Sequence, residues 1–548
     1  MRASLRILPR VSYPGILRHP AFWLLPLLLA GYWGLAAPQL GAPLLWDEVN
    51  FFWNAQAIAE TGVPYANAGF LTDRGAVGPQ YQYGLWHPPL YLYTLGLGLK
   101  LFGASEAVAR GVGVALMTLT ALCVYLLGWQ TIPPPARPWG ALLAVAIFLV
   151  SPLVIQSALV LDIDGTVLTL LLAVWTLLYL RLEAVAGRRT IPALSLLVVV
   201  FALALWAKLT TPFALLAVLL VYQTLRGRPL RGLLHLGVIG LGGTALFAAT
   251  WGLACWWLGL PFDMPLGVTW AELADALGGE HGALAERLET QALPILAWVS
   301  PYLTALFVGA AMARAVAFVR RRRLEPVDFL LGFGALVCLA YFIKLAAGFP
   351  KYHIAMMPFW AVVIAHWMAE SWARLPRAAV CALLLLTAVG LGLAFAYAVT
   401  WLADSWMLEP RALEQPEGLG LGLLAGGLLG VAALARRPAL VAPLTAGVVA
   451  LYGGWAASAD WYHTWVPYST NYWYGTMGQR EMAAVVDELL GRYGIDGPYI
   501  GAKEVVFYTH HQAFLDQDTV YWLWGEQGQP FDGRLFGYEI PLVVAWAR

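Results

Sequence analysis

Two adjacent acids, Asp47 and Glu48, stand directly after the first apolar segment of the chain, in the sequence LLWDEVNFFWN. The preceding stretch, residues 21–40, is long enough to cross a bilayer, because about 20 apolar residues span roughly 30 Å of hydrocarbon. The two carboxylates are therefore expected where the chain leaves the lipid. A carboxylate at this boundary can serve as the general base for a hydroxyl nucleophile. Acids are also favoured in the first turn of any helix, so a plain helix start is the competing interpretation.

Further ionisable residues occur at the ends of apolar segments, where desolvation makes a charge costly. Asp162 and Asp164 interrupt the sequence LVLDIDGTVL, and either of them would also suit a helix N-cap. Lys208 and Lys351 lie in LALWAKLTTPF and FPKYHIAMMPFW. A lysine at this depth could bind the phosphate of a lipid-linked substrate, or simply extend its ammonium group from the lipid to water.

The composition identifies the class of protein. Of the 548 residues, 60% are hydrophobic and 12% are charged, against about 45–50% and about 25% in average soluble domains. The 26 tryptophans fit the aromatic belts of a protein that crosses a membrane many times. A formal net charge of +1 argues against a nucleic-acid partner. The four cysteines all lie in apolar runs, without the spacing of metal ligands or of a disulfide framework.

The arginine clusters predict the orientation, because short cytoplasmic loops are enriched in Arg and Lys. These clusters lie within residues 2–18, 181–189, 226–231, 320–323, 374–377 and 436–437. Four apolar segments, at about 88–103, 105–129, 138–160 and 165–182, separate the loop of the paired acids from the second cluster, yet a passage from outside to inside needs an odd number of spans. The weakest segment, residues 88–103, starts with two prolines and is predicted to be an interfacial helix. This leaves about 13 spans, an outer C-terminus and all the candidate site residues on the outer face.

Two parts of the chain differ in character. Residues 1–457 are predicted to form a transmembrane domain, with outer loops at about 39–104 and 259–293. Residues 458–548 are predicted to form a small extracytoplasmic α/β domain, because short strands alternate there with helices. Its expected elements are an amphipathic helix at 480–493, a strand at 498–501, a helical turn, further short strands and a terminal IPLVVAW strand.

The chain resembles the GT-C superfamily of polyprenyl-phosphate-sugar-dependent glycosyltransferases, and especially its protein O-mannosyltransferase and aminoarabinose transferase types. The resemblance is carried by five segments in order: LLWDEVNFFWNAQAIAETG, HPPLYLY, the LDIDG turn, WAKLTTPF and FPKYHIAMMPFWAVV. It implies a polytopic α-helical membrane protein of the plasma or inner membrane. It also implies transfer of a sugar from a polyprenyl-phosphate donor to a hydroxyl of a glycan, lipid or protein acceptor on the outer face, with inversion.

The resemblance further implies a catalytic group of acids, a pair of lysines for the donor phosphate and two residues in the substrate pocket. These are, in turn, Asp47, Glu48, Asp162 and Asp164; Lys208 and Lys351; and His87 and Tyr352. The first acid is expected to be the base, with the second in the same pocket, and Asp164 is preferred over Asp162 as the later acid.

Two questions stay open in the sequence. A divalent Mg or Mn ion could bridge the acids and the phosphate, although nothing in the sequence requires one. The alternative function is an ion- or proton-coupled secondary transporter. Transporter acids are expected near mid-span, beside broken helices in repeated halves, whereas the acids of this chain lie at the ends of spans.

Overall fold

The computed structural model describes most of the chain, and every structural statement below concerns the described residues. These are residues 19–45, 47–66, 82–163, 165–184, 190–278, 299–344, 350–405, 427–429, 438–465, 478–495, 499–510, 513–516, 534–535 and 538–539. Helices form nearly all of this structure, and the strands are short. The α-helices are α2 (Pro20–Ala36), α3 (Asp47–Thr61), α6 (Leu90–Phe102), α7 (Glu106–Thr131), α8 (Arg137–Leu149), α9 (Pro152–Leu159), α10 (Thr166–Ala184), α11 (Thr190–Ala207), α12 (Pro212–Leu225), α13 (Pro229–His235), α14 (Gly242–Leu258), α15 (Met264–Gly278), α18 (Pro301–Arg321), α19 (Pro326–Lys344), α20 (Met357–Trp372), α21 (Arg377–Ser405), α23 (Pro438–Trp465), α24 (Gln479–Arg492) and α25 (Lys503–Val506). The remaining elements are η1 (Ala37–Gln39), the π-helical η2 (Leu236–Leu241), η4 (Pro350–Met356), β1 (Tyr499–Gly501), β2 (Ala513–Asp516), β3 (Arg534–Leu535) and β4 (Tyr538–Glu539).

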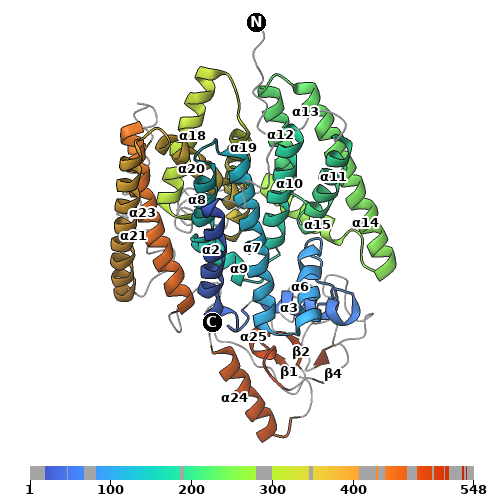
Figure 1. Cartoon of the computed structure of the whole chain (residues 1–548). Helices are drawn as coiled ribbons and strands as arrows, with labels where there is room; N and C mark the ends of the chain where they lie inside the picture. Colours follow the sequence, from blue (N-terminus) through green and yellow to red (C-terminus); the bar gives the residue numbers. More distant parts are fainter. Residues whose placement is uncertain are drawn as a thin grey trace.

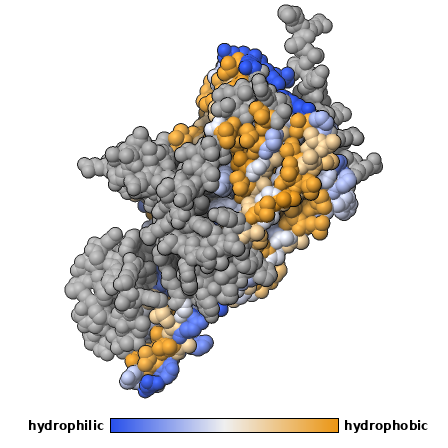
Figure 2. Space-filling view, turned by 90° about the vertical axis from the view of Figure 1, so that its left-hand side faces the viewer, coloured by the Kyte–Doolittle hydropathy of each residue, from blue (hydrophilic) through white to orange (hydrophobic). Residues whose placement is uncertain are grey.

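The long helices form a bundle with an apolar outer surface. Within the described residues, eight helices are long and apolar enough to cross a membrane, and α8 with α9 would make a ninth. On α21, Leu384, Leu385 and Leu386 are 54–67% exposed, as expected of side chains that face lipid rather than water. Figure 2 shows apolar residues across this flank, with hydrophilic residues above them. The chain is thus an integral, multi-pass membrane protein, while the count of about 13 spans stays a prediction.

The predicted single span at residues 138–160 is wrong in one respect, because it is broken in the middle. Helices α8 and α9 meet at an angle of 62°, and the break lies at Ser151 and Pro152. Proline has no amide proton and clashes with the preceding turn of a helix, and it favours an extended residue before it. Ser151 accordingly has a ψ of 126°. The break turns α9 toward the end of the bundle that is predicted to face outside. Leu161 and Asp162 follow α9 there.

The predicted first outer loop, residues 39–104, is called loop 1. It contains two short helices that pack on each other. Figure 1 shows α3 and α6 at the lower end of the bundle, near the C-terminal elements and far from α13 at the upper end. Helix α6 has 13 residues, which is about 20 Å at 1.5 Å per residue and less than the thickness of the hydrocarbon core. Its interfacial placement stays a prediction, but its length fits that assignment.

The C-terminal part contains the predicted alternation of helix and strand. The amphipathic helix α24 occupies almost the predicted range, β1 pairs in parallel with β2, and α25 lies between those strands in the chain. Residue 458, the predicted start of this domain, falls within α23, so the membrane helix continues further than expected. The predicted IPLVVAW strand lies outside the described residues.

Candidate functional site

The described candidate residues lie around one end of the bundle, the end that is predicted to face outside. The connection between α9 and α10 lies there, and η4 packs against both of these helices. Helix α11 ends at the same level, beside α6. The predicted cytoplasmic arginines lie at the opposite ends of the helices, for example in the last turn of α10 and of α18. The elements that carry the predicted acids and lysines therefore converge, although they are distant in the sequence.

Glu48 is buried and holds three segments together. Its Oε1 accepts hydrogen bonds from Arg110 Nη1 at 2.7 Å and from the backbone N–H of Leu161 at 3.0 Å. Its Oε2 accepts from Arg110 Nη2 at 3.0 Å and from the backbone N–H of Leu45 at 2.9 Å. A carboxylate with four donors has no free position for a substrate. The contacts of Glu48 suit a residue that holds the chain in place, and its predicted place in the reactive pocket with Asp47 stays a prediction.

Arg110 completes this arrangement and was not among the predicted residues. Its side chain is fully buried, and it also donates to the carbonyl oxygens of Pro43, at 3.0 Å, and of Leu159. One guanidinium group therefore joins loop 1, α7 and the end of α9, with Glu48 as its counter-ion. The sequence EAVARGVGV could have indicated this role, because a lone cation inside an apolar span usually faces a protein partner.

Asp47 is the exposed member of the acid pair. Adjacent residues on a helix point in different directions, and the side chain of Asp47 is 66% exposed while that of Glu48 is 4% exposed. The Oδ1 atom of Asp47 lies 3.9 Å from Nζ of Lys503, at the start of α25. Asp47 can therefore meet a substrate, and it is the acid of the pair that can act as a base.

Of the two later acids, the structure describes Asp162; Asp164 lies outside the described residues, so the preference for Asp164 stays a prediction. Asp162 is 4% exposed and follows the α9 helix directly. The buried phenol of Tyr91, on α6, lies against the backbone of Asp162 and within electrostatic reach of Glu48 and Arg110. The prediction that Asp162 comes near the Asp47–Glu48 pair agrees with this geometry, because Leu161 is hydrogen-bonded to Glu48.

Lys208 and Tyr352 form a second polar group. Lys208 follows the last residue of α11 and is 4% exposed, and its ammonium group lies 5.0 Å from the centre of the Tyr352 ring. A cation over an aromatic ring is attracted to the π-electrons. Lys351 lies beside Tyr352 on η4, but its side chain is outside the description. His87 is half-buried just before α6, and its place in the substrate pocket stays a prediction.

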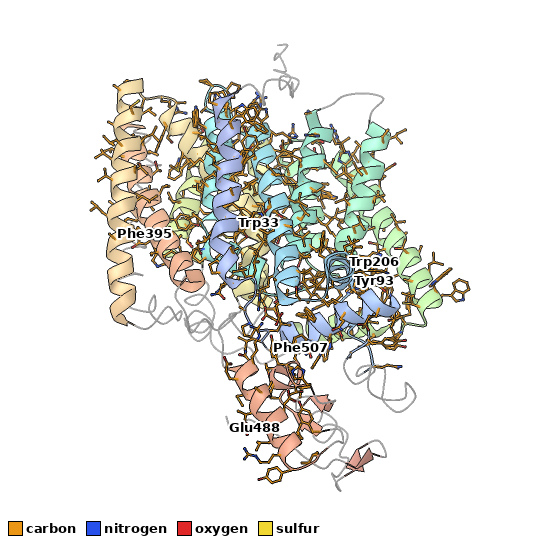
Figure 3. The ribbon with its side chains drawn as sticks, turned by 60° about the horizontal axis from the view of Figure 1, so that its bottom comes forward. Trp33, Tyr93, Trp206, Phe395, Glu488 and Phe507 are labelled. Carbon is orange, nitrogen blue, oxygen red and sulfur yellow. The ribbon has the colours of Figure 1, made fainter. Side chains whose placement is uncertain are left out.

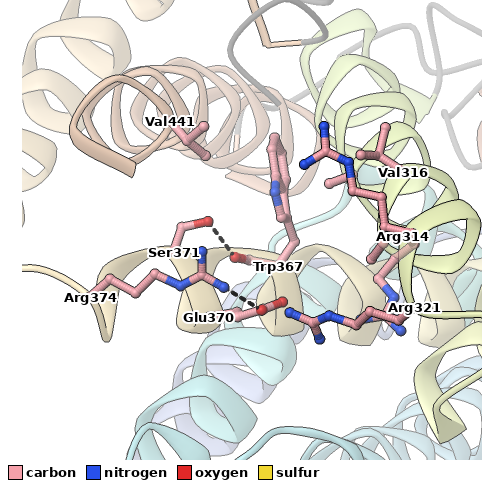
Figure 4. Close-up of a pocket in the computed structure, with 11 residues that line it drawn as sticks. Arg314, Val316, Arg321, Trp367, Glu370, Ser371, Arg374 and Val441 are labelled. Carbon is pink, nitrogen blue, oxygen red and sulfur yellow. Dashed lines mark hydrogen bonds and ion pairs between the residues drawn. The ribbon is translucent and has the colours of Figure 1, made fainter. Parts of the chain in front are cut away.

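A pocket at the opposite end of the bundle contains none of these residues. It has a volume of about 240 Å³ and lies between α18, α20 and α23, among arginines of the predicted cytoplasmic clusters. Figure 4 shows Arg374 paired with Glu370 beside Trp367. Arg314, also in its wall, is paired with Asp328 at 2.8 Å. These cations are thus paired with acids at the end of the bundle that is predicted to be cytoplasmic. As for metals, the described residues hold no cluster of three or more His, Cys, Asp or Glu that could bind an ion.

Comparisons with known proteins agree with this architecture. Residues 86–256 match the family model described as dolichyl-phosphate-mannose-protein mannosyltransferase. The chain is similar in structure to ArnT from Cupriavidus metallidurans in the apo state, with a TM-score of 0.53, 14% identity and coverage of 93% of this chain and 92% of that one. The same relative bound to undecaprenyl phosphate gives a TM-score of 0.55 and 16% identity, with 92% of each chain covered. A comparison with curated protein sequences gives no match. These findings agree with the resemblance seen in the sequence: residues 86–256 are similar to a mannosyltransferase family model, and nearly the whole chain shares the fold of the ArnT structures.

Proposed function

We propose that this protein moves a sugar from a polyprenyl-phosphate donor to an acceptor hydroxyl at the outer face of the membrane, with inversion at the anomeric carbon. The observation that carries the proposal is the convergence of an exposed carboxylate, Asp47, and a buried cation, Lys208, at one end of the bundle. A carboxylate suits the acceptor side of such a reaction and a cation suits the phosphate side.

The donor phosphate is assigned to Lys208, Tyr352 and Lys351. Lys208 follows the end of α11, where that helix lies beside α6, and a cation at the end of a span suits the headgroup region that holds a lipid phosphate. Tyr352 fixes the direction of the ammonium group. The ArnT relative has been crystallised with undecaprenyl phosphate, which supports a lipid phosphate as the ligand of a chain with this fold.

The acceptor side is assigned to Asp47. The hydroxyl oxygen of the acceptor attacks the anomeric carbon from the face opposite the phosphate, and its proton passes to the Asp47 carboxylate. The bond between the anomeric carbon and the phosphate oxygen breaks, and its electron pair leaves with the polyprenyl phosphate. Lys208 and Lys351 stabilise that negative charge. The rest of the catalysis is positioning, because a neutralised phosphate is already a good leaving group.

The test compares Asp47→Asn with Glu60→Gln, an acid at the exposed end of the same helix, α3. Each variant is reconstituted in liposomes with undecaprenyl-phosphate sugars, and product is measured by mass spectrometry. We expect Asp47→Asn to lose transfer with an unchanged melting temperature, while Glu60→Gln transfers sugar as the wild type does. Near wild-type turnover in purified Asp47→Asn would show that this acid merely starts the helix.

The sugar and the acceptor are to be identified in cells. Mass spectrometry of the outer glycans and lipids from cells with and without the protein should show one modification that disappears with it. An intact modification in cells carrying only Asp47→Asn would contradict the proposal, whatever the sugar is.

A further inference from the structure

The C-terminal elements are docked on the first outer loop by aromatic contacts. Phe507, just after α25, packs edge-to-face on Phe52 with ring centres 5.2 Å apart, and it also contacts Trp53 at 5.8 Å. Figure 3 shows Phe507 at the junction between the C-terminal helices and the membrane bundle. The hydroxyl of Tyr508 accepts a hydrogen bond of 2.7 Å from the backbone N–H of Leu44. This part of the chain is therefore held directly against the start of α3.

A charged contact reinforces the same interface. Arg480, on α24, donates to Glu106 at 2.7 Å and to the carbonyl oxygen of Gly41 at 3.1 Å. Its guanidinium also lies 5.2 Å from the centre of the Tyr508 ring. Burial raises the pKa of the Tyr508 phenol above its ordinary value, so this ring stays neutral beside the cation. Helices α24 and α25 are thus fixed to loop 1 and α7 at several independent points.

This docking brings a buried lysine to the exposed acid. The side chain of Lys503 is only 9% exposed, and its Nζ lies 3.9 Å from Oδ1 of Asp47. A lysine so strongly buried keeps its charge only with compensating partners, and Asp47 is the carboxylate it faces. Because the side chain of Asp47 is 66% exposed while its Oδ1 faces Lys503, the carboxylate has room for a hydroxyl group beside that contact.

We propose that Lys503 is a positioning residue for glycosyl transfer, which makes the C-terminal region part of the active site. Lys503 holds the Asp47 carboxylate in one orientation, with Oδ2 directed to the acceptor. Misplacement of a catalytic group by about 1 Å can cost on the order of 100-fold in rate. The inference rests on the proposed function, in which Asp47 receives the proton of the acceptor.

The experiment measures kcat and both KM values for Lys503→Gln, Lys503→Arg and a control, Lys100→Gln. Lys100 is an exposed lysine on α6. The substrate is the undecaprenyl-phosphate sugar that the wild type consumes. We expect Lys503→Gln to lower kcat roughly 10- to 100-fold with little change in the KM for the donor. Lys503→Arg should recover part of the loss, because it keeps the charge in a different shape. The control should match the wild type.

A double variant separates positioning from simple docking. In an Asp47→Glu background, whose carboxylate is already displaced, Lys503→Gln should cause little further loss, because residues that act through one another are not additive. An equal fold-loss in both backgrounds, or a loss that merely follows a lower melting temperature, would overturn the positioning role. Full activity of Lys503→Gln with an inactive Asp47→Asn would also overturn it, and would leave the proposed function intact. Full activity of Asp47→Asn would overturn both.

Discussion

Replacing Glu48 by Gln should destabilise the protein far more than the same change at its neighbour Asp47. Each oxygen of Glu48 accepts one hydrogen bond from Arg110 and one from a backbone N–H. The amide of Gln keeps only one acceptor oxygen, so one bond of each kind is lost in either orientation of the amide. A hydrogen bond to a charged group contributes about 1.5–3 kcal/mol and a neutral one about 0.5–1.5 kcal/mol.

The buried ion pair gives a second estimate of the same loss. The guanidinium of Arg110 would keep its carbonyl partners but would have no counter-ion, and removing one partner of a buried ion pair typically costs about 3–5 kcal/mol. We therefore expect the free energy of unfolding to fall by about 3–5 kcal/mol. Titration of the purified protein from mild detergent into SDS measures it. Asp47→Asn, with its exposed side chain, should change the unfolding free energy by less than about 0.5 kcal/mol.

A double variant gives the decisive comparison. Glu48→Gln combined with Arg110→Met removes both charges and should be more stable than the sum of the two single losses predicts, since the cost of an unpaired buried charge disappears. Strict additivity, or a Glu48→Gln protein that unfolds like the wild type, would refute the view that this ion pair fixes loop 1 to the α9–α10 connection.

Three further predictions test the donor site, the topology and the metal. Lys208→Gln and Lys351→Gln should each weaken binding of undecaprenyl phosphate by about 1–3 kcal/mol, as measured by thermal shift. Unchanged affinity in both variants would show that these lysines only extend their ammonium groups from the lipid to water. With the four native cysteines replaced, single cysteines at Glu60 and Tyr493 should react with an impermeant thiol reagent added outside, and one at Arg323 should not; the reverse pattern would invert the predicted orientation. Turnover should persist in EDTA, whereas its loss and recovery with Mg or Mn would assign a bridging metal to the site.

The sequence predicts the elements of this protein better than their contacts. The span expected at 105–129 is α7, and the amphipathic helix expected at 480–493 is α24, because hydrophobic periodicity and length are local properties. The break before Pro152 has a local cause as well, but the apolar run on both sides hides it. The pair of acids, Asp47 and Glu48, is also visible in the sequence. Their different environments are not, because these depend on the burial of one side chain and the exposure of the other.

Long-range partners are what the sequence could not supply. Glu48 is paired with Arg110, which lies in the next long helix, and Asp47 faces Lys503 near the other end of the chain. Neither distance is encoded in a spacing, because each results from the way several helices pack. Lys208 and Tyr352 were predicted for different tasks at the same site, and their direct contact follows from the packing of η4 near the end of α11.

The ion pair of Glu48 and Arg110 also has a consequence for how the protein is made. Glu48 leaves the ribosome first, Arg110 enters the membrane with α7 later, and Leu161 follows after α9. An unpaired arginine within a span is costly at insertion, and Glu48 can neutralise Arg110 only when loop 1 and the start of α7 reach the same side of the membrane. A chain inserted with loop 1 on the wrong side would carry Arg110 without its counter-ion. The pair should therefore favour chains in which loop 1 and the start of α7 reach the same side of the membrane, and all of its partners are synthesised before the C-terminal half.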